Sequence, residues 1–155
     1  MANPYQAPKA PVVDQPAGLP KPVMPLAAAV IVASAAAMAL MSISTILGAA
    51  FAGAIILDGN SSLRVLLYFA LEFALAFGAV YLCCVLAIRW SASNPYAAAL
   101  PVGLICAAFS IWEGLGSLRT GDASFWYFLV LMLLPLAAAI AAALIRARGR
   151  KESPR

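Results

Sequence analysis

Two carboxylates inside apolar segments are the residues of this chain that could do chemistry. Glu72 lies in the run Tyr68-Phe-Ala-Leu-Glu-Phe-Ala-Leu-Ala-Phe-Gly78, and Glu113 lies in a later apolar segment, residues 97–118. A charged carboxylate at the centre of a bilayer costs about 2.5 to 3.5 kcal/mol on insertion scales, so we expect neither side chain to face lipid. Intramembrane carboxylates serve as proton or cation sites, or as hydrogen-bonding groups between helices.

The residues around each carboxylate predict a polar helical face. Small or polar side chains recur at intervals of three or four, which places them on one side of a helix. At about 1.5 Å per residue, Glu72 is expected roughly 13 Å and Glu113 roughly 9 Å from the outer boundary. We therefore predict a shared polar pocket that includes Thr45 and Ser110, with Tyr127 at similar depth. The three rows are Glu72, Ala76, Ala79 and Cys83; Cys106, Ser110, Glu113 and Ser117; and Ser34, Met38, Met41, Thr45 and Gly48.

Three roles are open for such a pair. Apart from Arg64 at the very start of the second segment, no lysine, arginine or histidine lies within the apolar segments to neutralise the carboxylates, so two adjacent ones are expected to share a proton at neutral pH. The pair can be a hydrogen-bonded device that fixes the register of the helices. It can be a proton or cation site facing an outer vestibule. It can also be a contact to a partner subunit that supplies the missing base.

The segments that must position these residues are long and apolar. Hydrophobic residues make up 65% of the 155-residue chain and charged residues only 10%, far from the balance of a soluble domain. Each of four segments is long enough to cross about 30 Å as a helix. We predict an all-α membrane protein, an antiparallel bundle of four transmembrane helices. The expected spans are residues 26–57, 63–88, 97–118 and 124–145.

The basic residues predict the orientation of this bundle. Of the ten lysines and arginines, Arg64 and Arg119 fall in the first and third loops, and the other eight fall in the two tails and the second loop. Basic residues concentrate on the cytoplasmic side of membrane proteins, so we expect both termini in the cytoplasm. The basic tail, residues 146–155, is expected to anchor this topology and to touch anionic lipid.

The N-terminal segment predicts a location more than an activity. Residues 1–25 hold seven prolines and few apolar side chains, so we expect a disordered, partly polyproline leader. With its opening Asn3-Pro-Tyr-Gln-Ala-Pro8, followed by a proline-rich run and four spans, the chain resembles small polytopic inner-membrane proteins of bacteria of unknown function. The resemblance implies a bacterial inner-membrane location. The same tripeptide recurs at residues 94–96, where we predict a turn and a helix start.

The sequence offers no residue set for catalysis, metal binding or a cofactor. It contains no histidine, which removes bis-histidine haem, most zinc and copper sites, and a histidine-dependent triad. Cys83 and Cys84 are adjacent, and with Cys106 they fall in the inner halves of their segments, away from the oxidising compartment. We expect these cysteines to be small buried residues rather than a redox pair.

These patterns favour a small, non-enzymatic accessory or interaction subunit of the membrane. Its expected partners are the lipid bilayer and a membrane protein or a second copy, with no nucleic acid. The alternative is a small proton- or cation-coupled transporter that uses Glu72 and Glu113. Alanines spaced by four at Ala29, Ala33 and Ala37, and the alanine-rich stretch 137–143, allow helices to approach closely, most simply within one chain.

Overall fold

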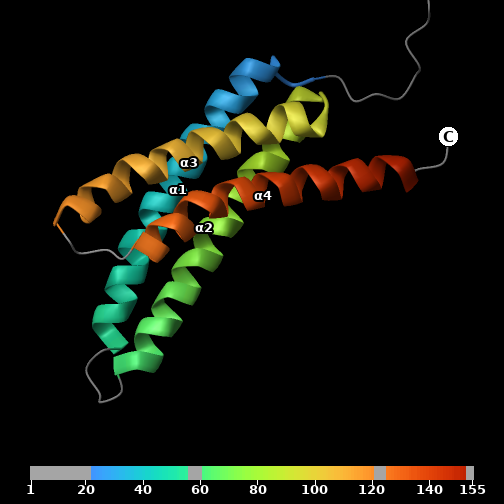
Figure 1. Cartoon of the computed structure of the whole chain (residues 1–155). Coiled ribbons are helices and arrows are strands. Elements are labelled where there is room, and N and C mark those ends of the chain that lie inside the picture. The colour runs from blue at the N-terminus through green and yellow to red at the C-terminus, as the bar shows by residue number, and fades with distance from the viewer. Residues whose placement is uncertain (1–21, 56–60, 121–124, 153–155) are drawn as a thin grey trace, which may run out of the picture.

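The protein is a bundle of four α-helices (Figure 1). The computed structural model describes residues 22–55, 61–120 and 125–152. This architecture confirms the predicted fold class, whereas the leader, residues 1–21, lies outside the described residues. The last helix runs seven residues past the predicted end at 145, because the basic tail consists largely of arginine, alanine and lysine, which favour helix. The helices are α1 (Leu26–Ile55), α2 (Ser61–Ser91), α3 (Pro95–Thr120) and α4 (Phe125–Glu152).

Each helix is long and apolar enough to cross a membrane. The apolar stretches within them are 21 to 26 residues long, and about 20 residues span the hydrocarbon core. Many large apolar side chains point away from the bundle, as a lipid environment allows. The chain is therefore a multi-pass integral membrane protein. The four stretches are Leu26–Gly48, Leu66–Ser91, Pro95–Leu115 and Leu129–Gly149.

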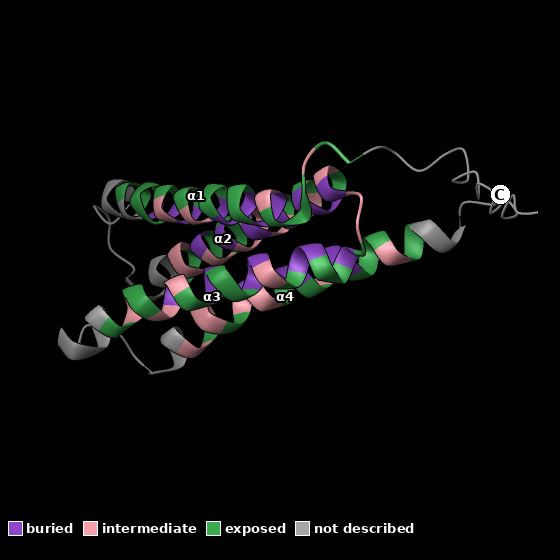
Figure 2. Ribbon diagram, turned by 90° about the horizontal axis from the view of Figure 1, so that it is seen from above, coloured by how far each residue is buried: buried purple, intermediate pink, exposed green. Residues whose placement is uncertain are grey.

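The helices form two antiparallel pairs. α1 packs along α2, and α3 packs along α4. α2 and α3 occupy the middle of the bundle, and among the described residues α1 makes no contact with α4. The two pairs cross at an angle, and their far ends separate (Figures 1 and 2).

One end of the bundle gathers the start of α1, the turn between α2 and α3, and the end of α4; we call it the basic end, because it carries Arg89, Arg146 and Arg148. The N–H groups of Val23 and Met24 both donate to the carbonyl of Trp90, at 2.8 and 3.3 Å. Trp90 is in the last turn of α2, where carbonyls have no partner within the helix. The segment before α1 therefore caps α2.

The core lies in the half of the bundle nearest the basic end. Figure 2 shows buried residues between the helices and exposed residues on the outer surfaces. Small side chains dominate this core, so the helix backbones approach closely. Ala29, Ala33 and Ala37 are buried, which confirms that the spaced alanines of the first helix serve packing within the chain. Other core residues are Ala76, Val80, Cys84, Ala87, Ala98, Val102, Cys106, Ala138, Ala139, Ala142 and Ala143.

The turn between α2 and α3 is built by residues 92–94. Ala92 adopts a positive φ of 48°, the left-handed conformation that commonly ends a helix. Asn94 then caps α3: its Oδ1 accepts the N–H of Tyr96 at 3.0 Å, and its carbonyl accepts the N–H of Ala98. Pro95 occupies the first helical position, where its missing N–H costs nothing. The predicted helix start is thus confirmed.

We expect Asn94→Ala to lower the free energy of unfolding by about 1 kcal/mol, because the acceptor for the Tyr96 N–H is removed. Thermal unfolding in detergent micelles measures the change. Asn94→Ser keeps a side-chain acceptor and should stay within a few tenths of a kcal/mol of the wild type. If the serine variant loses as much stability as the alanine variant, the cap is not the cause.

Candidate functional site

Glu72 is held inside the contact between α1 and α2. Its side chain is only 3% exposed, and its carboxyl lies beside the hydroxyl of Tyr68, one turn earlier on the same helix, close enough to interact with it. The Tyr68 ring lies against Gly48 of α1: a methyl group added at Gly48 would come 3.0 Å from Cε2 of that ring. A glycine on one helix therefore makes room for the tyrosine that holds the buried carboxyl of the other.

The two predicted hydroxyl groups lie in different environments. Ser110 is buried, and its Oγ donates to the carbonyl of Cys106 at 3.0 Å. Thr45 is exposed, and its Oγ1 donates to the carbonyl of Met41 at 3.2 Å. Its neighbour Ser44 is the buried residue and donates to the same carbonyl at 2.7 Å. The interior face of α1 therefore includes Ser44 in place of Thr45, while Met41 and Gly48 of the predicted row are buried as expected.

Glu113 lies on the surface of the bundle. Its side chain is exposed, and the adjacent Trp112 is 78% exposed. The expectation that both carboxylates turn inward is thus confirmed for Glu72 and wrong for Glu113 in the single chain. Among the described residues, no hydrogen bond joins the two carboxyl groups. The side chain of Tyr127 lies outside the described residues.

Depth along the helices does not separate the two glutamates. Glu72 lies nineteen positions before Ser91 at the end of α2, and Glu113 lies eighteen positions after Pro95 at the start of α3. At about 1.5 Å per residue, both carboxylates are about 27 to 29 Å from the turn. Because the helix pairs diverge away from the basic end (Figure 1), residues at one level of α2 and α3 face different surroundings there.

The cysteines belong to the core. Cys83, Cys84 and Cys106 are all buried and free, which confirms the prediction of small buried residues. Cys84 also links two helices, because its Sγ donates to the carbonyl of Ala99 on α3 at 3.7 Å. Thiols are weak donors, so this contact adds to the close packing of α2 and α3 rather than to a redox site.

Three further residues shape the interior, and two of them, Tyr68 and Gly103, were not predicted to do so. Tyr68 was not assigned to hold Glu72, although their spacing of four residues is the signal that would have found it. Ser34 was placed on the polar face of the first helix, and it is buried with its Oγ unpaired among the described residues. Gly103, where α3 packs closely against α4, gave no signal beyond being a glycine in an apolar helix.

The fold and the buried carboxyl define a small multi-pass membrane protein with a polar group locked between its first two helices. No family model, no curated protein and no solved structure matches the chain.

Proposed function

We propose that the chain is a small, non-enzymatic interaction subunit of a bacterial inner membrane, with both termini in the cytoplasm. Its binding face is the surface of α3 around Trp112 and Glu113, and its partner is a membrane protein. The observation that carries the proposal is the contrast between the two carboxylates. Glu72 is satisfied inside the chain, and Glu113 is presented on the surface.

The position of Glu113 along α3 places its carboxylate where contact with lipid is costly, so a partner helix would stabilise it. It lies seventeen residues beyond Tyr96, or about 26 Å of helix, whereas the hydrocarbon core is about 30 Å thick. With Tyr96 at one membrane interface, Glu113 therefore lies within the hydrocarbon core, close to the opposite interface. A carboxylate facing lipid there is costly, and a helix with a lysine, arginine or amide side chain at that depth would offset the cost.

The surroundings of Glu113 also suit a contact surface. Trp112 offers a large exposed ring, and tryptophan is enriched among the residues that contribute most to binding. Leu115, one turn from Trp112, is exposed as well. An apolar ring beside a single polar group is the arrangement that fixes both the affinity and the orientation of a partner helix.

The orientation rests on the charge distribution. Arg89, Arg146 and Arg148 gather at the basic end, beside the aromatic side chains of Trp90 and Tyr96. Basic residues mark the cytoplasmic side, and tryptophan and tyrosine favour the interface. The basic end therefore belongs to the cytoplasmic face and Glu113 to the outer half of the membrane.

Co-purification tests the proposed function. We expect the tagged full chain, extracted from its native membrane in mild detergent, to carry one membrane protein at fixed stoichiometry. Glu113→Ala and Trp112→Ala should each reduce the captured partner at least tenfold, whereas Leu104→Ala, an exposed position on α3 nearer the basic end, should not. Recovery of the chain alone, or equal capture by all variants, contradicts the proposal. A captured second copy would identify the interaction as self-association.

Proton or cation coupling is the second candidate, favoured by the equal depth of Glu72 and Glu113 along their helices. In proteoliposomes with an imposed pH gradient, a transporter would move protons or cations, and Glu72→Gln or Glu113→Gln would abolish the flux. An interaction subunit gives no flux above that of empty vesicles. The same preparation therefore separates the two candidates.

A further inference from the structure

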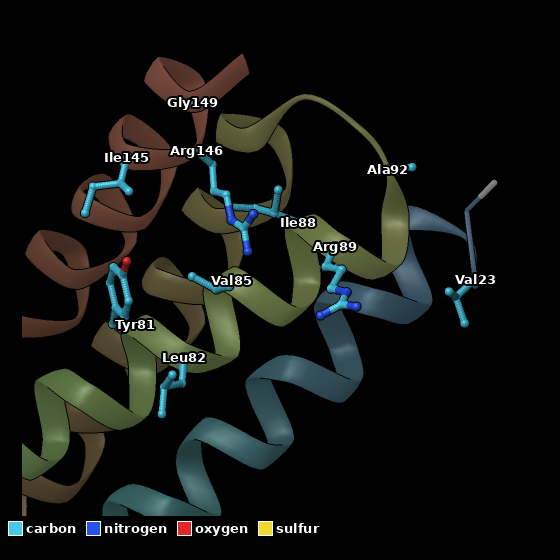
Figure 3. A pocket seen from close by; sticks show the side chains of 10 residues that line it. All are labelled: Val23, Tyr81, Leu82, Val85, Ile88, Arg89, Ala92, Ile145, Arg146 and Gly149. Atoms are coloured by element: carbon cyan, nitrogen blue, oxygen red, sulfur yellow. The ribbon is translucent and has the colours of Figure 1, made fainter. Parts of the chain in front are cut away.

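A groove at the basic end combines two guanidinium groups with an apolar wall (Figure 3). It lies between α2 and α4 beside Val23, the residue before α1 whose N–H caps α2, and its volume is about 770 Å³. Arg89 comes from α2 and Arg146 from α4, so two elements far apart in the sequence supply the positive charge. No acidic side chain is among the residues that line it.

Both guanidinium groups are available to a ligand. Figure 3 shows Arg146 extending from α4 toward α2, where its side chain lies near Ile88. Arg89 is the next residue of α2 after Ile88. Both arginines are exposed, and neither makes an ion pair within the part of the chain that the structure describes. Two arginines that line one groove with no acidic side chain among its lining residues favour an anion, and guanidinium groups bind phosphate oxygens in pairs.

The rest of the groove is apolar and open to the bilayer. Tyr81 and Leu82 lie about two turns before Arg89, or about 10 to 12 Å along α2. On the opposite wall is Ile145 of α4. Leu82 is 59% exposed and Ile145 is 56% exposed, so this wall can take up a hydrocarbon chain that runs down from the charged end.

The groove also lies where lipid headgroups are. Arg89 and Arg146 fall in the last turns of the apolar stretches that end at Ser91 and Gly149. Phosphates of the bilayer lie at this level, just outside the hydrocarbon core. A free anion would use the guanidinium groups but not the apolar wall, whereas a phospholipid uses both.

We propose that the groove between α2 and α4 is a binding site for an anionic phospholipid, whose phosphate is held by Arg89 and Arg146 and whose acyl chain lies along Leu82, Val85 and Ile145. Basic pockets between transmembrane helices on the cytoplasmic side bind anionic headgroups in this manner. The site does not depend on the partner proposed above, because it lies at the opposite end of α3 from Trp112.

Native mass spectrometry of the delipidated full chain, titrated with phosphatidylglycerol or phosphatidylcholine in detergent, tests the site. We expect phosphatidylglycerol to bind at least tenfold more tightly. Arg89→Gln and Arg146→Gln should each weaken it about fivefold, as expected for one guanidinium near the membrane surface. Equal binding of the two lipids would overturn the proposal. So would full competition by inorganic phosphate, which would identify a site for free anions.

Two further variants separate the groove from general attraction to a basic tail. Arg148→Gln removes a neighbouring exposed charge that does not line the groove, so it should leave the binding of phosphatidylglycerol unchanged within about twofold. Gly149→Leu keeps all charges but places a side chain in the groove, where nothing lies within 4 Å of an added methyl group. We expect it to weaken binding at least fivefold. A loss with Arg148→Gln equal to that with Arg146→Gln, or no loss with Gly149→Leu, would refute a defined site.

Discussion

Gly103→Ala is expected to lower the free energy of unfolding by about 1 to 3 kcal/mol, the usual cost of overpacking a well-packed core. A methyl group at this position would come 2.6 Å from Cβ of Ala139 and 3.1 Å from the carbonyl oxygen of Pro135 on α4. Backbone and a Cβ atom cannot rotate away, so α3 and α4 must separate. Unfolding in mixed micelles with increasing denaturing detergent measures the loss.

Gly78→Ala is the matched control, because it makes the same change inside α2, where nothing lies within 4 Å of the added methyl group. Alanine is a better helix former than glycine by about 1 kcal/mol, so this variant should be as stable as the wild type or more so. If the two variants lose stability equally, helix packing at Gly103 is not the reason.

Tyr68→Phe is expected to destabilise the protein by about 1 to 3 kcal/mol, because it removes the hydroxyl that lies beside the buried Glu72 carboxyl and can donate a hydrogen bond to it. Glu72 is 3% exposed, so water cannot replace the lost partner without opening the α1–α2 contact. The same unfolding measurement applies. Tyr81→Phe, also on α2, removes a hydroxyl for which the described residues show no hydrogen bond, and should be close to neutral.

A double variant tests whether the hydrogen bond itself is responsible. Replacing both partners of a buried hydrogen bond by apolar groups is often nearly neutral, whereas removing one is costly. Tyr68→Phe combined with Glu72→Leu should therefore recover most of the stability lost by Tyr68→Phe alone. A further loss in the double variant would indicate that Glu72 has another partner of greater weight.

The positions of the helices could largely be predicted from the sequence, whereas the side chains that each helix turns toward its neighbours could not. The tripeptide at residues 94–96 signalled the start of α3, and the structure places the cap and the first helical proline there. The spacing of Ala29, Ala33 and Ala37 signalled a close contact, and all three are buried. Both signals are local, since a cap and a small-residue row depend only on neighbouring positions of one helix.

The candidate site was predicted less well because it depends on how helices turn toward one another. Each residue rotates the direction of its side chain by about 100° around the helix. Between the buried residues Met41 and Gly48 of α1, Ser44 is buried and Thr45 is exposed. A row of residues spaced by three and four positions can include either Ser44 or Thr45. The packing of the neighbouring helix decides which of the two is buried.

The sequence by itself determined that the chain has four membrane-spanning helices, and nearly where they begin and end. In a bilayer each helix satisfies its own backbone hydrogen bonds, and the hydrocarbon thickness sets its length, so both properties are local. Only the tertiary structure decided that Glu72 is enclosed with Tyr68 while Glu113, at the same level, is exposed. The physical reason is the crossing of two helix pairs that pack tightly on small residues at the basic end and diverge beyond them (Figure 1).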